Sequence, residues 1–485
     1  MNLNSVPYVL LLAAVALLHW ALRPELRCGF LLLASWVFYG ICAPRFLPLL
    51  LATTLLVYGL GRWMGARPAR RKPILLLGLL VCFGILFLFK YLGFFGGLLS
   101  SLLARAGLAP LQLPALLMPA GISFYTFALC GYLMDVYRGR QAPETSFVDF
   151  ALFASFFPAI LSGPIERATH LLPQLKAHRR GGSPSGEDVR IGVTRFLLGL
   201  FKKMVLADQL AIVVNTAYGD PAAFTGVQLL GAALAYSLQI YCDFSAYSDM
   251  AIGSARLLGF TLLENFHAPY LCSSIQDFWR RWHISLSSWF RDYLYFPLGG
   301  SRRGTVRKYV NVLIVFAVSG LWHGAAMTFV VWGLLNGVYQ VIGALTAPVR
   351  ARIRGALHLA DGAAVTRCIQ AVLCFLLLTV TWVFFRAASL QQALEILGRI
   401  FTLAGGVFPL NVTALGLSRA RLLAVGLAVI VLLILDIRSQ LPARQRLCDT
   451  VWRRYAVWTA LILAIVVFGA YGPGYNAQEF LYFQF

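Results

Sequence analysis

Two histidines in this 485-residue sequence lie where an imidazole could do chemistry. His323 lies in the run Ser-Gly-Leu-Trp-His-Gly between two apolar stretches, and an ionisable group at membrane depth is a functional candidate by default. The flanking Gly320 and Gly324 would let a backbone or a substrate approach closely. Such an imidazole suits general-base chemistry, in which it takes a proton from a hydroxyl group. A histidine hydrogen-bonded between two helices is the structural alternative.

The second histidine, His283, lies in a polar and aromatic segment from Asp277 to Asp292. If this segment forms one helix, Arg280, His283 and Ser287 share a face at spacings of three and four residues. A neighbouring strip would then carry Arg281, Ser285 and Asp292, and the tryptophans Trp279, Trp282 and Trp289 would anchor at the membrane interface. An amphipathic interfacial helix with no chemical role explains the pattern equally well.

Two aspartates lie in the run from Tyr241 to Met250. Asp243 and Tyr247 are neighbours on one helical face, four residues apart, and Asp249 lies on another side. Substrate binding is one possible role for Asp243 and Tyr247. A structural ion pair with an arginine is the slightly favoured interpretation, because acids within membrane segments are usually paired.

Composition indicates the elements that must position these groups. Hydrophobic residues make up 59% of the chain and charged residues only 12%, with a mean hydropathy of +0.75. These values exclude a disordered chain, a coiled coil, a collagen-like fibre and an ordinary soluble enzyme. At about 20 residues per span, the length allows roughly 10–12 transmembrane helices.

Apolar stretches of spanning length recur along the chain, with the expected helix breaks at Pro48, Gly320 and Gly324. The stretches cover residues 6–22, 29–60, 73–95, 148–165, 226–260, 309–347, 369–386, 422–435 and 456–470. Between about 110 and 300, polar and aromatic residues mix with apolar ones, and the segment 276–295 is too polar to face lipid. We therefore expect re-entrant or interfacial helices there, protected by surrounding spans.

The chain carries 41 Lys and Arg against 19 Asp and Glu, a formal net charge of +22. Basic clusters at 67–72, 176–180, 302–308, 350–354 and 444–454 separate the apolar stretches. The positive-inside rule places most of these loops in the cytoplasm. Nucleic-acid binding is not expected, since no basic segment accompanies a recognition motif.

The sequence lacks the motifs that are typical of several other reaction classes. The sequence has no G-x-S-x-G elbow, no phosphate-binding loop and no H-E-x-x-H pair. None of the nine cysteines forms a C-x-x-C pair, so neither a metal site nor a disulfide framework is expected. General-base chemistry by a membrane-embedded histidine, non-enzymatic transport and a scaffolding role remain as function classes.

These motifs together resemble the membrane-bound O-acyltransferase (MBOAT) family, and within it the branch that acetylates bacterial polysaccharides. The strongest resemblance lies in 277–300 and 320–324, which place the two histidines in this order and 40 positions apart. Further matching pieces lie at 119–127, 135–139, 156–164, 199–203, 241–249, 265–270 and the closing aromatic run 480–485. The resemblance covers almost the whole chain.

The resemblance implies an all-α membrane core with opposed funnels that meet near the middle. His323 then corresponds to the catalytic base of the family, and His283 to a second position that assists substrate binding. The other side chains expected at the substrate or along the tunnel are Trp279, Arg280, Trp282, Ser287, Asp292, Trp322, Asp243 and Tyr247. The expected extent is a single domain over 1–485, with 110–345 as its catalytic core.

The resemblance also implies an activity. An acetyl group would pass from a cytoplasmic donor, acetyl-CoA, across the bacterial inner membrane to periplasmic acetyltransferase subunits that esterify an exopolysaccharide. Alginate is the first expectation for the polymer, and cellulose and peptidoglycan are the alternatives. Membrane lipids and those periplasmic subunits are the expected partners, and no bound cofactor is expected.

Overall fold

Helices and the turns between them make up the computed structural model of the chain, which describes residues 1–111, 113–114, 116–182, 184–358, 360, 363–406, 411–440, 450–471 and 480. Within these ranges there is no β-strand, and one isolated antiparallel bridge joins Phe266 to Trp282. The expected all-helical class is confirmed. Most of the aromatic run at 480–485 lies outside the described residues.

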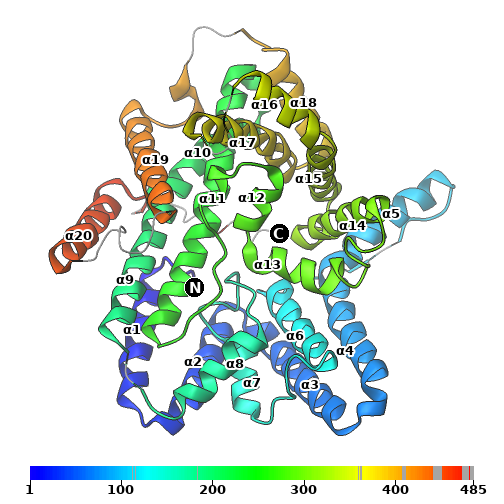
Figure 1. Cartoon of the computed structure of the whole chain (residues 1–485), viewed down its shortest axis with the longest axis vertical. Helices are drawn as coiled ribbons and strands as arrows, with labels where there is room; N and C mark the ends of the chain where they lie inside the picture. The colour runs from blue at the N-terminus through cyan, green and yellow to red at the C-terminus, as the bar shows by residue number, and fades with distance from the viewer. Residues whose placement is uncertain are drawn as a thin grey trace. The chain divides into compact units, whose positions relative to one another are not determined.

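The chain divides into two compact units, whose helices are labelled in Figure 1. The first contains residues 1–196 and 247–263, and the second contains 197–246 and 264–485. The first unit holds α1 (Val6–Ala21), α2 (Pro24–Cys42), α3 (Leu47–Ala66), α4 (Arg71–Leu86), α5 (Leu92–Arg105), α6 (Ile122–Tyr137), α7 (Phe147–Ser155) and α8 (Ala168–His178). Both α9 (Gly186–Phe201) and α11 (Gly226–Leu257) contain a unit boundary.

The second unit contains both candidate histidines and is therefore the unit that positions the chemistry. Its helices are α10 (Asp208–Gly219), α12 (Ile275–Arg281), α13 (Ile284–Phe290), α14 (Thr305–His323), α15 (Met327–Leu345), α16 (Ala347–Ala356), α17 (Ala364–Arg386), α18 (Leu390–Phe401), α19 (Arg419–Ser439) and α20 (Val451–Phe468). Across the described part of the chain, three π-helical segments occur, at Phe87–Tyr91, Lys202–Ala207 and Arg291–Tyr295. The predicted catalytic core at 110–345 stays a prediction.

Eight helical segments in the described part of the chain are long and apolar enough to cross a membrane. They are α2, α3, the continuous stretch Pro68–Arg105, α14, α15, α17, α19 and α20. The number is lower than the 10–12 estimated from chain length, because much of the middle of the chain forms short or polar helices instead of spans. The expected re-entrant or interfacial character of the middle segments fits this observation.

Three of the predicted breaks and stretches differ from the structure. The break in 29–60 falls at Ala43 and the turn Pro44–Phe46, and Pro48 lies in the first turn of α3, where a proline is tolerated. The apolar stretch 148–165 forms only the short helix α7, which ends at Ser155. Gly320 continues α14 instead of breaking it, whereas Gly324 ends the helix as expected.

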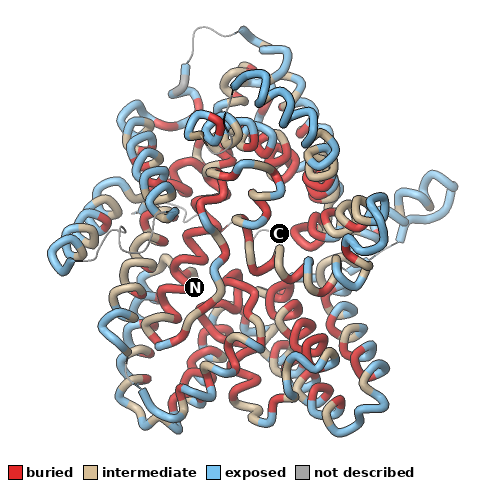
Figure 2. Tube along the Cα trace, viewed as in Figure 1, coloured by how far each residue is buried: buried red, intermediate tan, exposed pale blue. Residues whose placement is uncertain are grey.

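Exposed surfaces on the outer helices are apolar, as a lipid-facing surface requires. In Figure 2, α6 is buried along most of its length, whereas α20 and the end of α5 are largely exposed. The exposed side chains of α20 include Ile462, Leu463 and Val467. Because such faces are unfavourable in water, the chain is a multi-pass membrane protein.

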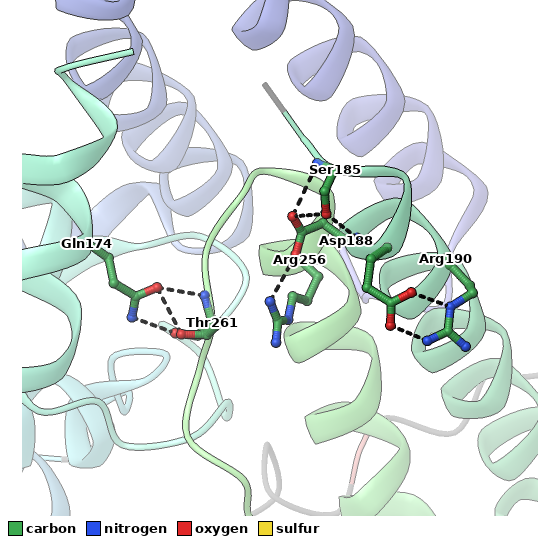
Figure 3. Close-up of polar contacts among 7 residues, drawn as sticks. Gln174, Ser185, Asp188, Arg190, Arg256 and Thr261 are labelled. Carbon is green, nitrogen blue, oxygen red and sulfur yellow. Dashed lines mark hydrogen bonds and ion pairs between the residues drawn. The ribbon is translucent and has the colours of Figure 1, made fainter. Parts of the chain in front are cut away.

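The start of α9 shows how local polar contacts fix a helix end in the first unit (Figure 3). The Ser185 hydroxyl accepts a hydrogen bond from the Asp188 backbone N–H at 3.0 Å, and the Asp188 carboxylate accepts one from the Ser185 N–H at 3.2 Å. This reciprocal arrangement is a capping box. The same carboxylate pairs with Arg256 at 2.9 Å, and the Gln174 amide is hydrogen-bonded to Thr261, so the capped helix end is tied to the end of α11.

Candidate active site

A break between α12 and α13 positions His283. The segment 265–267 pairs with 281–284: the His267 N–H donates to the Arg281 carbonyl, and the Ile284 N–H donates to the Asn265 carbonyl, both at 3.0 Å. His283 itself takes a left-handed backbone conformation, with φ of 44°. The segment 277–292 is therefore not one helix, because long-range backbone pairing replaces the helical hydrogen bonds at this point, and the condition for the shared face of Arg280, His283 and Ser287 is not met.

His323 is the last residue of α14 and is 3% exposed. Gly324 follows in extended conformation, which ends the helix and turns the chain towards α15. A Cβ atom at Gly320 would collide with the Phe329 carbonyl oxygen, so the glycine allows the backbones of α14 and α15 to pack closely. The close-approach role predicted for Gly320 is correct, although the contact is with the neighbouring helix.

The two histidines lie side by side within the second unit. Their ring centroids are 6.2 Å apart with an interplanar angle of 59°, and the His283 side chain is fully buried. The Trp322 ring lies 5.8 Å from the His283 ring and 5.0 Å from the His323 ring. Two imidazoles at this separation can both face one small reacting group.

Aromatic rings enclose the histidine pair. The Phe244 ring lies 4.6 Å from the His283 ring, edge-on. Trp332 and Phe385 lie 5.0 and 5.4 Å from the His323 ring, also edge-on. A wall of this kind restricts the access of water to the two imidazoles.

A cavity of about 1430 Å³ in the second unit runs beside α14. Three residues predicted at the substrate line it: Trp279, Arg280 and Ser287. Ser319, which precedes His323 by one helical turn, also lines it. The cavity therefore comes within one helical turn of His323 along α14, although its lining includes neither histidine.

Trp282, another predicted tunnel residue, packs inside the protein. Its ring contacts the rings of Phe278, Phe266 and Trp382 at centroid distances of 5.0 to 5.2 Å. Its carbonyl oxygen accepts a hydrogen bond from the Ser287 hydroxyl at 3.2 Å. Trp282 therefore supports the α12–α13 break that holds His283.

A buried ion-pair cluster holds Asp243. The Lys203 ammonium lies 2.8 Å from the Asp243 carboxylate and 2.9 Å from the Asp208 carboxylate, and all three side chains are nearly inaccessible. Burial lowers the pKa of Lys203, but the two carboxylates outweigh it and hold that pKa above its usual value. The expected structural ion pair is present, with a lysine as the partner instead of an arginine.

Asp292 and Tyr247 are the remaining predicted residues. Asp292 pairs with Arg291 at 3.1 Å in the π-helical segment that follows α13. Tyr247 is buried on α11 but belongs to the first unit. In that unit Asp249 pairs with Arg195 at 2.8 Å, which is the arginine pairing expected for an acid in this run.

The sequence interpretation missed four residues of the site: Phe244, Trp332, Phe385 and Lys203. The three aromatic residues lie in apolar runs, where nothing distinguishes them from other buried rings. Lys203 did carry a usable signal, since it directly precedes the apolar run 204–207, and an ionisable side chain within an apolar region is expected to have a buried partner. Among the described residues, no group of three or more His, Cys, Asp or Glu side chains could hold a metal ion.

Comparison with known proteins identifies the family to which this geometry belongs. The model of the membrane-bound O-acyltransferase family matches residues 141–374, which include both histidines. The probable alginate O-acetylase AlgI of Pseudomonas putida is 40% identical over 77% of this chain and 74% of its own length. The chain belongs to the membrane-bound O-acyltransferase family. Its activity class is accordingly O-acyl transfer, and the resemblance inferred from the histidine motifs is confirmed.

Two other relatives within the family act on different acceptors. The peptidoglycan O-acetyltransferase of Helicobacter pylori is 34% identical over 80% of this chain and 76% of its own length. The teichoic acid D-alanyltransferase of Bacillus subtilis is 29% identical over 45% of this chain and 57% of its own length. The names of the three relatives thus describe acetyl or D-alanyl transfer, each with a different polymer: alginate, peptidoglycan or teichoic acid.

Proposed function

We propose that this chain transfers an acetyl group from cytoplasmic acetyl-CoA across the bacterial inner membrane, for the O-acetylation of an exopolysaccharide, with alginate as the first candidate. Periplasmic acetyltransferase subunits would receive the group and esterify the polymer. The observation that carries the proposal is the buried pair of His283 and His323, in a chain 40% identical to a probable alginate O-acetylase.

His323 acts as the general base in this proposal. Its imidazole takes the proton from the acceptor hydroxyl as the hydroxyl oxygen attacks the thioester carbonyl carbon. The tetrahedral intermediate collapses, the carbon–sulfur bond breaks, and the proton passes from the imidazolium to the departing thiolate. The products are the O-acetyl ester and free coenzyme A, so atoms and charge balance.

His283 positions the reacting group in this proposal. Its ring is held by Phe244 and Trp322 and by the backbone pairing around residue 283, so it lies in a fixed place opposite His323. A fixed neighbour that hydrogen-bonds the acceptor or the carbonyl oxygen lowers the barrier by orientation. The aromatic wall keeps water from hydrolysing the thioester.

Peptidoglycan is the second candidate acceptor, because the relative from Helicobacter pylori is 34% identical over 80% of this chain. A gene-replacement experiment distinguishes the two. The chain is expressed in an alginate-producing strain that lacks its own membrane acetylase, and in a strain that lacks its peptidoglycan acetylase. Nuclear magnetic resonance then measures acetyl groups on alginate, and mass spectrometry measures them on muropeptides.

Acetylated alginate in the first strain, lost in the variant H323A, is the expected result. Acetylated muropeptides alone would move the proposal to the second acceptor. Restored polymer export without acetylation, or acetylation that survives H323A, would contradict the enzymatic role and favour a transporter or a scaffold.

A further inference from the structure

A single acidic residue lies in the predominantly apolar helix α19. This helix is long and apolar enough to cross a membrane, and Asp436 is the only aspartate or glutamate in it. Because a carboxylate within a span is costly, such a residue is a functional candidate by default. No step of the proposed function uses Asp436, and α19 lies outside the residues 141–374 that the family model matches.

The partner of Asp436 is a buried tyrosine of α11. The Tyr241 hydroxyl donates to the Asp436 carboxylate, whose two oxygens lie 2.9 and 3.0 Å from it. Tyr241 is 2% exposed, and both residues belong to the second unit, in which α19 lies beside α11 (Figure 1). A hydrogen bond to a carboxylate is stronger than one between neutral groups, so this contact restrains the Tyr241 ring.

The Tyr241 ring packs against residues that hold His283. It lies 5.9 Å from the Phe266 ring and 6.2 Å from the Trp282 ring, and these two residues form the antiparallel bridge next to His283. Phe266 in turn lies 4.9 Å from Phe244, whose ring packs on His283. A restrained Tyr241 therefore supports the break between α12 and α13 from the side of α19.

A second contact from α19 reaches the backbone pairing around His283. Gln440 follows Asp436 by four residues, at the end of the same helical face. The Arg281 guanidinium donates to the Gln440 side-chain oxygen at 3.1 Å, and the Gln440 side-chain nitrogen donates to His267 Nε2 at 3.1 Å. His267 and Arg281 are themselves joined by a backbone hydrogen bond of 3.0 Å. Both contacts of α19 thus converge on the residues that place His283.

We infer that Asp436 and Gln440, at the end of α19, are positioning residues for His283. Asp436 acts through the Tyr241 ring, and Gln440 acts through the backbone pairing around residue 283. A side chain that only orients a reacting group changes the rate and not substrate affinity, so kcat should depend on these residues while KM does not. The inference rests on the role proposed for His283, whereas the contact itself can be measured without any activity.

The test uses the full-length protein in nanodiscs, and size-exclusion chromatography verifies folding. D436L removes the acceptor of the hydrogen bond, Y241F removes its donor, and D436N keeps an oxygen that can accept it. Hydrogen exchange with mass spectrometry measures the protection of backbone amides in 265–267 and 282–284. An assay with radiolabelled acetyl-CoA and a periplasmic acceptor subunit measures kcat and KM.

Matched controls lie on the same two helices. Y236F on α11 removes a buried tyrosine hydroxyl that has no hydrogen-bond partner among the described residues. R438Q removes a charge at an exposed position of α19, two residues from Asp436. Both controls should behave as the wild type, because neither touches the contact between Asp436 and Tyr241.

D436L and Y241F are expected to speed exchange in 265–267 and 282–284, to lower kcat about tenfold and to leave KM nearly unchanged. The double variant D436L/Y241F should resemble either single variant, because both substitutions break the same hydrogen bond. D436N should keep most of the wild-type kcat and protection. Q440A should speed exchange in the same two segments.

Unchanged exchange in both D436L and Y241F would overturn the inference, as would faster exchange with an unchanged kcat or an equal loss in Y236F. These outcomes are separable from failure of the proposed function. A wild type that ignores acetyl-CoA, with faster exchange in D436L, keeps the contact and removes the donor. A wild type that transfers acetyl groups normally, with D436L matching it in both assays, keeps the function and removes the inference.

Discussion

His283 and His323 lie with their ring centroids 6.2 Å apart, although 40 positions separate them in the sequence. The backbone reaches this arrangement in two ways: a left-handed residue at a helix break places His283, and a glycine-ended helix places His323. Each of these two backbone features can be tested by a substitution at a single position that leaves the rest of the site in place.

The backbone at His283 gives the first prediction. Asparagine tolerates the left-handed region, whereas a β-branched residue does not. We expect H283N to fold like the wild type and to lower kcat about tenfold to a hundredfold, because the positioning side chain is lost. We expect H283V to lower the thermal midpoint as well, in a fluorescence-detected unfolding assay. Equal thermal midpoints for the two variants would show that the observed backbone conformation does not constrain this position.

The packing of α14 against α15 gives the second prediction. G320A places a methyl group against the Phe329 carbonyl, so the helices must separate and His323 must move. Both the thermal midpoint and the acetyl-transfer rate should fall, the rate by about tenfold or more, since small misplacements of a catalytic group are costly. The control is G231A on α11, where nothing lies within 4 Å of the added methyl group and stability should stay the same or rise. Similar losses in both variants would contradict the close-packing role.

The buried cluster around Lys203 gives the third prediction. K203M leaves the Asp208 and Asp243 carboxylates buried without their cation, which should cost about 3–5 kcal/mol of stability. The triple variant K203M/D208N/D243N removes the unpaired charges and should recover much of that loss. Thermal unfolding in detergent measures all three proteins. A triple variant no more stable than K203M would show that the pairing contributes little.

The histidine motifs could be predicted because their chemistry is local: an ionisable side chain between apolar stretches and a glycine that ends a helix are both visible in the sequence. The helix break at His283 could not be predicted from the sequence, because it depends on backbone pairing with residues 265–267. The ion pair of Asp243 was predicted, but its partner was expected to be an arginine, because a carboxylate does not specify whether lysine or arginine will pair with it. The residues that line the cavity could not be predicted either. In the sequence, Phe316 and Tyr339 look like ordinary residues of apolar spans, and only the packing of the helices places them at the cavity.

The role of His323 as the base is tested by a transfer assay with the purified protein in nanodiscs. Acetyl-CoA labelled in the acetyl group is supplied with a periplasmic acceptor subunit, and free coenzyme A and labelled acceptor are counted. The account predicts that H323A lowers transfer by about 10²–10⁴ while it inserts and folds normally. The control H358N, at an exposed histidine in the left-handed region, retains wild-type transfer. Transfer at the wild-type rate in a folded H323A protein would contradict the account.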